Sequence, residues 1–300
     1  MRGEIVSLDS MKVYRRMDIG TAKPSAEARA AIPHHLIDLV EPSEGFTVVR
    51  YLEFAEKTLA DLAARRCPAV VVGGTFLYLK ALTSGMFDGP GADPAIRARL
   101  NEEAETQGLD ALHDRLRGID PAAAQRIHVN DLRRVIRALE VFELTGKPIS
   151  DHQQQWATST PDRGFQLLGL RREAEDQSHR TNERVRRMVE AGLVEEVRAL
   201  LAEEKPLSMT ARKAVGYAEM IEHLAGRVTL ADAIEMIKIN TRQFAKSQRT
   251  WMKRFEANQQ AGLAGQQAGF AGDWIDLAEG ATAKQIADDL MSAAKLPWSA

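Results

Sequence analysis

The sequence has few of the features that mark secreted, metal-binding or membrane proteins. Its single cysteine, Cys67, excludes a disulfide framework and a zinc site built from several cysteines. The seven histidines do not occur at metal-ligand spacing with cysteine or carboxylate partners, so we expect no metal site in them. No apolar run approaches about 18 residues and no charged-then-apolar leader is present, so we expect a cytoplasmic protein without a membrane span.

An excess of charge of either sign is also missing. Lys and Arg number 40 against 42 Asp and Glu, which gives a formal net charge of −2. The field of the whole molecule therefore does not favour nucleic acid, and any polyanion must be held by local basic patches. A hydrophobic content of 44% is enough to bury a full core, as one large domain or one domain with an insertion.

Short apolar runs that alternate with helical periodicity predict an α/β core. We expect a buried strand at 4–8, a helix at 48–65 and a second buried strand at 69–72. Strand, helix, strand in this order is typical of a parallel sheet. Further expected elements are strands at 165–170 and 274–278, one long helix at 179–204, two or three helices after it, a Gln/Ala/Gly linker at 256–273 and a closing helix at 281–295.

The block 92–164 differs from the rest because it contains charged helices and no strand pattern. We interpret it as a helical insertion in a core formed by 1–91 and 165–300.

Two of the predicted strands end in polar turns, Asp9-Ser10 and Gly73-Gly74-Thr75. Ligands of parallel α/β sheets bind just beyond the carboxyl ends of the strands. Adjacent glycines let backbone approach a ligand, and the helix that follows offers N–H groups to an anion. The alternatives are that Asp9 only caps the next turn and that the Gly-Gly-Thr turn is a plain connector.

Two segments are locally basic. Arg126, Arg133, Arg134 and Arg137 fall within twelve residues that contain one acidic residue, Asp131, and no acidic residue occurs between Glu235 and Glu256. In the second segment Arg242, Lys246, Arg249 and Lys253 form a helical stripe that suits a polyanion, with Ile237, Phe244, Trp251 and Phe255 as expected core anchors. The alternative is a solvated helix face. Upstream, Lys213 precedes a Gly216-Tyr217 turn that could approach backbone or stack on a base.

Several quoted motifs carry a family resemblance. "SLDSMKVYRRMDIGTAKPS", "HHLIDL", "VVVGGTFLYLKAL", "DPAIRARL", "NDLRRVIRALEV", "KAVGYAEM" and "NTRQFAKSQRTWMKRF" resemble, in order and spacing, the motifs of the bacterial tRNA dimethylallyltransferases. The resemblance implies a P-loop nucleoside-triphosphate-hydrolase-like core with a helical insertion. It implies transfer of a dimethylallyl group from dimethylallyl diphosphate to N6 of adenosine 37, in the anticodon stem-loop of tRNAs that read codons beginning with U. A monomer is expected.

The resemblance also assigns roles to positions of this sequence. Asp9 matches the carboxylate that bonds the adenine amino group and is proposed as general base, and Asp9, Ser10, Met11 and Lys12 match the pocket of the flipped base. Thr75 and Arg97 match positions near the reacting centre that contact the diphosphate. The matched tRNA-contacting positions are Arg133, Arg134, Val135, Ile136 and Arg137, and Lys213, Ala214, Val215, Gly216, Tyr217 and Ala218; the residues of the basic helix, Arg242, Lys246 and Arg249, are added from their spacing.

One family motif is missing. Members begin with a strand and a Gly-x-x-x-x-Gly-Lys-Ser/Thr loop, which cradles the diphosphate and supplies a hydroxyl ligand to Mg²⁺, the expected cofactor. The 300 residues contain no such loop, so we expect a chain truncated before the Asp9 strand. An inactive tRNA-binding remnant is the first alternative. A small-molecule kinase of the same fold is the second, but it explains neither basic segment.

Overall fold

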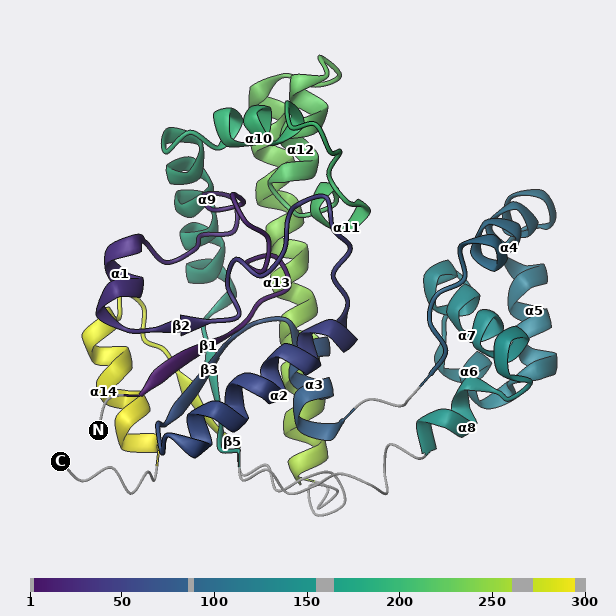
Figure 1. Ribbon diagram of the computed structural model, residues 1–300, viewed down its shortest axis with the longest axis horizontal. Coiled ribbons are helices and arrows are strands. Elements are labelled where there is room, and N and C mark those ends of the chain that lie inside the picture. The colour runs from purple at the N-terminus through teal and green to yellow at the C-terminus, as the bar shows by residue number, and fades with distance from the viewer. Residues whose placement is uncertain (1–2, 86–88, 155–164, 261–271, 295–300) are drawn as a thin grey trace. The chain divides into compact units, whose positions relative to one another are not determined.

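The computed structural model describes residues 3–85, 89–154, 165–260 and 272–294 (Figure 1). They form two compact units, each with its own hydrophobic core. The larger unit contains the described residues up to 83 and from 165 onward, and the smaller unit contains those from 84 to 154.

The larger unit contains strands and helices, as expected for an α/β core. Its elements are β1 (Glu4–Leu8), α1 (Ala26–Ala31), β2 (His34–His35), α2 (Val48–Ala64), β3 (Ala69–Gly73), α3 (Phe76–Ser84), β4 (Leu167–Arg171), α9 (Ala174–Glu190), α10 (Leu193–Leu201), α11 (Met209–Arg212), α12 (Tyr217–Leu224), α13 (Leu230–Gln260), β5 (Gly272–Asp276) and α14 (Ala283–Ala293).

The smaller unit is helical throughout its described residues. Its elements are α4 (Pro94–Gln107), α5 (Leu109–Ile119), α6 (Pro121–Arg126), α7 (Leu132–Thr145) and α8 (Ile149–Gln154). Leu100, Leu112, Leu116 and Leu139 are completely buried at its centre.

All strand pairs of the larger unit are parallel. β1 lies between β2 and β3, and β4 pairs with β5 in a second sheet. α2 packs on the first sheet, where the Tyr51 hydroxyl donates a hydrogen bond of 3.1 Å to the Ser7 carbonyl. Leu8 and Gly73 are register partners, so β1 and β3 end side by side. This register places the turns that follow them at one edge of the sheet.

Four features of the fold differ from the predictions. β3 forms where a buried strand is predicted at 69–72, but it is not buried, since every residue of it except Val71 is exposed. The expected helix at 179–204 is two helices, because the chain breaks at Gly192, whose φ of 99° only glycine adopts readily. The first five residues of the expected linker, 256–260, belong to α13, and 261–271 lie outside the described residues. β2 was not predicted as a strand, because two residues are too short for a period to be detected.

Candidate active site at the carboxyl ends of β1 and β3

The structure brings the two polar turns together, as predicted. The Ser10 N–H donates to Thr75 Oγ1 at 3.1 Å, and the Thr75 N–H donates to the Leu8 carbonyl at 3.3 Å. Gly73 permits this approach, since a Cβ there would lie 2.1 Å from the Leu8 carbonyl oxygen. The result is one half-buried polar surface formed by two segments about 65 residues apart.

The Asp9 carboxylate is fixed through one of its two oxygens. Oδ1 accepts the N–H groups of Met11 at 2.8 Å and Lys12 at 3.3 Å, so the capping role considered as an alternative is real. Among the described residues, no donor lies within hydrogen-bond distance of Oδ2. Asp9 therefore presents a positioned acceptor oxygen at the edge of the sheet.

A cationic side chain adjoins this carboxylate. Burial lowers the pKa of Lys12, the charge of Asp9 raises it, and the nearby charge of Arg184 lowers it. Arg184 projects from α9 and is exposed, and it was not among the predicted site residues. Its neighbour Glu183 pairs with Arg186 and Arg187 instead. Only the folded structure relates Arg184 to this turn, through the effect of its charge on the pKa of Lys12.

Helix α13 contacts the second turn and carries part of the predicted basic stripe. Gln248 Nε2 donates to the Gly74 carbonyl at 3.0 Å. Arg242 and Arg249 donate to the neutral amides of Asn182 and Gln177 on α9, so these contacts hold the guanidinium groups without neutralising their charge. The side chain of Lys246 is exposed.

The expected core anchors of α13 differ in how far they are buried. Ile237 is 2% exposed, and Trp251 and Phe255 are half-buried, with Trp251 stacked on Phe76 at a centroid distance of 6.4 Å. Phe244, however, is 52% exposed, so its prediction as a core anchor is wrong.

The segment 213–218 is mostly structural. Tyr217 is completely buried, and its hydroxyl donates to Glu196 Oε1 at 2.6 Å, so the hypothesis that it stacks on a base is wrong for this structure. Burial, with the charge of Glu196 next, raises the pKa of Tyr217 far above its ordinary value. Glu196 also accepts the N–H groups of Asp18, Ile19 and Gly20. Within the segment Lys213 and Val215 are exposed, Ala218 is half-buried, and Ala214 and Gly216 are buried.

Arg97 lies in the smaller unit, where a buried carboxylate holds it. Its Nε and Nη2 donate to Glu140 at 2.8 and 3.0 Å, and Arg137 donates to the same carboxylate at 2.7 Å. The side chain of Glu140 has no exposed area. Burial raises the pKa of Glu140, but the hydrogen bonds from Arg97 and Arg137 outweigh it, so the pKa lies below its ordinary value.

The other predicted residues of α7 lie on two faces of the helix, one buried and one exposed. Val135 and Ile136 are buried in the core of the smaller unit, at 1% and 6% exposure, so their side chains do not reach a ligand from there. Arg133 is exposed, and Arg134, also exposed, pairs with Asp131 at 3.2 Å. Arg133 and Arg134 are thus the residues of this segment that face solvent.

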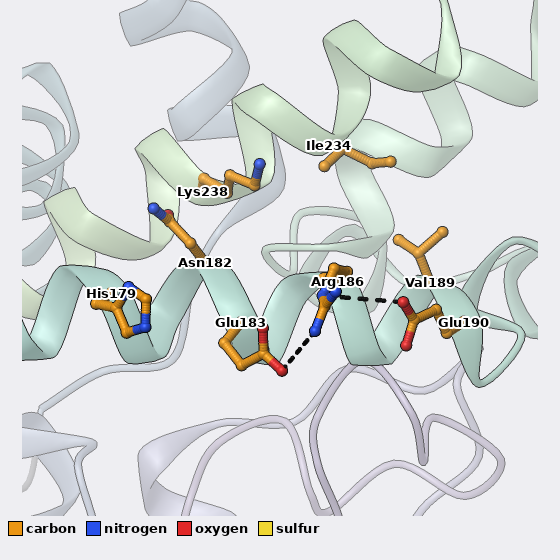
Figure 2. Close-up of a pocket in the computed structure, with 8 residues that line it drawn as sticks. All are labelled: His179, Asn182, Glu183, Arg186, Val189, Glu190, Ile234 and Lys238. Atoms are coloured by element: carbon orange, nitrogen blue, oxygen red, sulfur yellow. Dashed lines mark hydrogen bonds and ion pairs between the residues drawn. The ribbon is translucent and has the colours of Figure 1, made fainter. Parts of the chain in front are cut away.

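A cleft of about 400 Å³ lies between α9 and α13 (Figure 2). Its charged side chains pair with one another: Arg186 contacts Glu183 at 2.8 Å and Glu190 at 3.8 Å. No residue predicted for the site lines this cleft, so we assign it no part in the chemistry.

Metal and membrane features were also searched for. In the part of the chain that the structure describes, no three His, Cys, Asp or Glu side chains are grouped so that they could hold a metal ion. The expected Mg²⁺ therefore stays a prediction. Within the same residues, no helix has both the length and the apolar character needed to cross a bilayer.

Known proteins resemble this chain over most of its length. A family model described as IPP transferase matches residues 12–255. The proteins named tRNA dimethylallyltransferase of Geobacter metallireducens and Geobacter sulfurreducens are 48% and 46% identical to it over 252 residues, which is 84% of this chain and 82% and 81% of theirs. The crystal structure of a full-length tRNA isopentenylpyrophosphate transferase from Bacillus halodurans matches 97% of this chain and 88% of its own, with 37% identity and a TM-score of 0.64. A eukaryotic dimethylallyltransferase acting on tRNA matches 97% of this chain and 73% of its own, with 27% identity and a TM-score of 0.72.

Proposed function

The chain belongs to the IPP transferase family, and from this premise we propose that it is a tRNA dimethylallyltransferase. It transfers the dimethylallyl group of dimethylallyl diphosphate to N6 of adenosine 37 in tRNAs that read codons beginning with U. The observation that carries the proposal is the contact between the Asp9-Ser10 and Gly73–Thr75 turns, in a chain 48% identical to a protein of that name. Because the proposed substrate is tRNA, we propose that the protein is cytoplasmic and acts as a monomer.

The carboxylate oxygen of Asp9 that has no hydrogen bond is suited to activating the adenine amino group. Adenine N6 is a poor nucleophile inside a base stack, so the base must be flipped out and one of its N–H bonds polarised. Asp9 Oδ2 accepts that N–H and takes the proton as the N6–carbon bond forms. Oδ1, held by two backbone N–H groups, keeps the carboxylate oriented during the step.

The cations near the two turns are suited to stabilising the leaving diphosphate. As the carbon–oxygen bond to the diphosphate breaks, negative charge grows on the leaving group and needs positioned cations and N–H donors. Lys12 and Arg184 supply charge beside Asp9, and the Thr75 turn supplies polar groups. Arg97, oriented by Glu140, is proposed as a further diphosphate contact from the smaller unit.

Exposed cations outside the reacting centre are suited to contacting the phosphates of the tRNA backbone. We assign this role to Lys213, Arg133, Arg134 and Lys246, with Arg242 and Arg249 adding charge that the bonded amides do not neutralise.

The diphosphate cradle is proposed to need a strand and loop upstream of residue 1. Two observations support this. The 300 residues contain no Gly-x-x-x-x-Gly-Lys-Ser/Thr sequence. On β3, Val70 and Val72 are 49% and 53% exposed, although such a valine-rich strand is typical of one covered on both sides.

The test is transfer of labelled dimethylallyl from its diphosphate to unmodified tRNA, with the 300-residue chain and with a chain extended upstream in frame. We expect transfer by the extended chain, and a loss of about 10²- to 10⁴-fold in Asp9→Asn, the range of general acid–base catalysis. Asp61→Asn, an exposed carboxylate on α2, is the matched control.

The possible results separate the alternatives. A near-normal rate in Asp9→Asn contradicts the general-base role. If neither chain transfers the group but both bind tRNA, the tRNA-binding remnant is the correct reading. If neither binds tRNA, the proposed function is wrong.

A further inference from the structure

Phe244 interrupts an otherwise packed face of α13. Residues three and four apart share a helix face, so Ile237, Phe244, Gln248 and Trp251 form one stripe. On both sides of Phe244 this stripe is engaged: Ile237 is buried, Gln248 bonds the Gly74 carbonyl and Trp251 stacks on Phe76. Phe244 itself is 52% exposed. Phe244 is therefore an exposed aromatic ring between packed neighbours on the same helix face.

The contacts of the residues on either side of Phe244 place its ring near the carboxyl ends of β1 and β3. Phe244 lies four residues, about 6 Å along the helix axis, from Gln248 and hence close to the Gly73–Thr75 turn. One turn in the other direction, Asn240 Nδ2 donates to Glu219 at 2.6 Å, and Glu219 accepts the Gly216 N–H. The ring therefore lies between the Gly216 segment and the turn that contacts Ser10.

The side chains beside the ring indicate what kind of group fits. Asn240 and Gln248 each use the amide nitrogen in a protein contact, and among the described residues neither amide oxygen has a hydrogen-bond partner. A planar heteroaromatic group needs a flat face to stack on and polar groups at its edge. A branched hydrocarbon such as the dimethylallyl group would leave these amide oxygens without partners.

We propose that Phe244 stacks on the flipped adenine of the tRNA while Asp9 bonds its amino group. This inference rests on the proposed function and adds a residue that recognises the substrate. Base–aromatic stacking is expected to contribute to tRNA binding and not to binding of the diphosphate substrate.

The experiment compares binding of two end-labelled anticodon stem-loops by fluorescence anisotropy, one with adenosine at position 37 and one with an abasic residue there. We expect Phe244→Ala to bind the adenosine stem-loop about 10- to 100-fold more weakly and to lose most of the preference for it over the abasic stem-loop. Phe244→Tyr should restore both properties, whereas Phe244→Leu, which keeps bulk without an aromatic face, should not. Ile239→Ala, which removes a 44% exposed side chain from another face of α13, is the matched control.

Each result has a defined meaning. Melting temperatures of all variants separate loss of folding from loss of binding, and Phe244→Tyr keeps the test valid if Phe244→Ala unfolds. If Phe244→Ala or Phe244→Leu keeps both the affinity for the adenosine stem-loop and the preference over the abasic one, the inference is wrong. The inference is also wrong if these variants raise the KM for dimethylallyl diphosphate alone. If the parent chain does not bind the stem-loop, it is the proposed function that fails.

Discussion

At the scale of single residues, the buried carboxylate of Glu140 holds two arginines in place. Replacing Glu140 by Gln removes the charge that binds Arg97 and Arg137, and we expect the smaller unit to lose about 2 kcal/mol or more of unfolding free energy at pH 7. Glu143→Gln, at a carboxylate 20% exposed on the same helix, should cost less. Urea unfolding of the full chain measures both, and equal losses would contradict the special role of Glu140.

The pH dependence of the same variant gives an independent check. Because the pKa of Glu140 is lower in the folded protein than in the unfolded chain, its contribution is full above the unfolded pKa, near 4.5. This contribution is lost as the pH falls through the pKa of Glu140 in the folded protein. The stability difference between the parent chain and Glu140→Gln should therefore shrink on acidification below about pH 5. A difference that stays constant with pH would mean that charge is not the cause.

At the scale of elements, the long helix α13 carries lysines that differ in their partners. Lys238 pairs with Glu235 at 2.6 Å, whereas the exposed Lys246 has no acidic partner among the described residues. We expect Lys246→Ala to reduce the slope of log affinity for tRNA against log salt concentration by about one, the effect of one lost phosphate contact. Lys238→Ala is the matched control and should change the slope less. Equal slopes in Lys246→Ala and the parent chain would remove Lys246 from the tRNA surface.

The elements also show which features were predictable from sequence. β1 and β3 were predicted because their apolar runs end in polar turns, and the meeting of those turns followed from the parallel order. The break between α9 and α10 was missed because the helical period continues across Gly192. Periodicity predicted Phe244 as a core anchor beside Ile237, but a helical period does not reveal whether another element covers a side chain, and Phe244 is 52% exposed. Arg184 was missed because its relation to Lys12 exists only after folding.

At the scale of the whole molecule, the residues predicted for the site are divided between two units with separate cores. The larger unit contains Asp9, Thr75 and the basic face of α13, and the smaller unit contains Arg97 and the exposed arginines of α7. A sequence can predict such a division, because strand patterns are missing between 92 and 164. It cannot predict that β4 and β5 pair with each other and with no strand of the first sheet in the described residues.

The open side of β3 leads to a prediction about the proposed upstream strand. β3 pairs with β1 alone among the described residues, and an edge strand keeps unpaired N–H groups along its outer side. If the proposed upstream strand pairs with β3, amides of residues 69–73 should exchange with solvent deuterium at least about tenfold more slowly in the extended chain than in the 300-residue chain. Peptides from α5 and α7, in the core of the smaller unit, serve as the internal control and should exchange at the same rate in both. Unchanged exchange over 69–73 would mean that the upstream segment leaves this edge open, and the exposed valines of β3 would then need a different explanation.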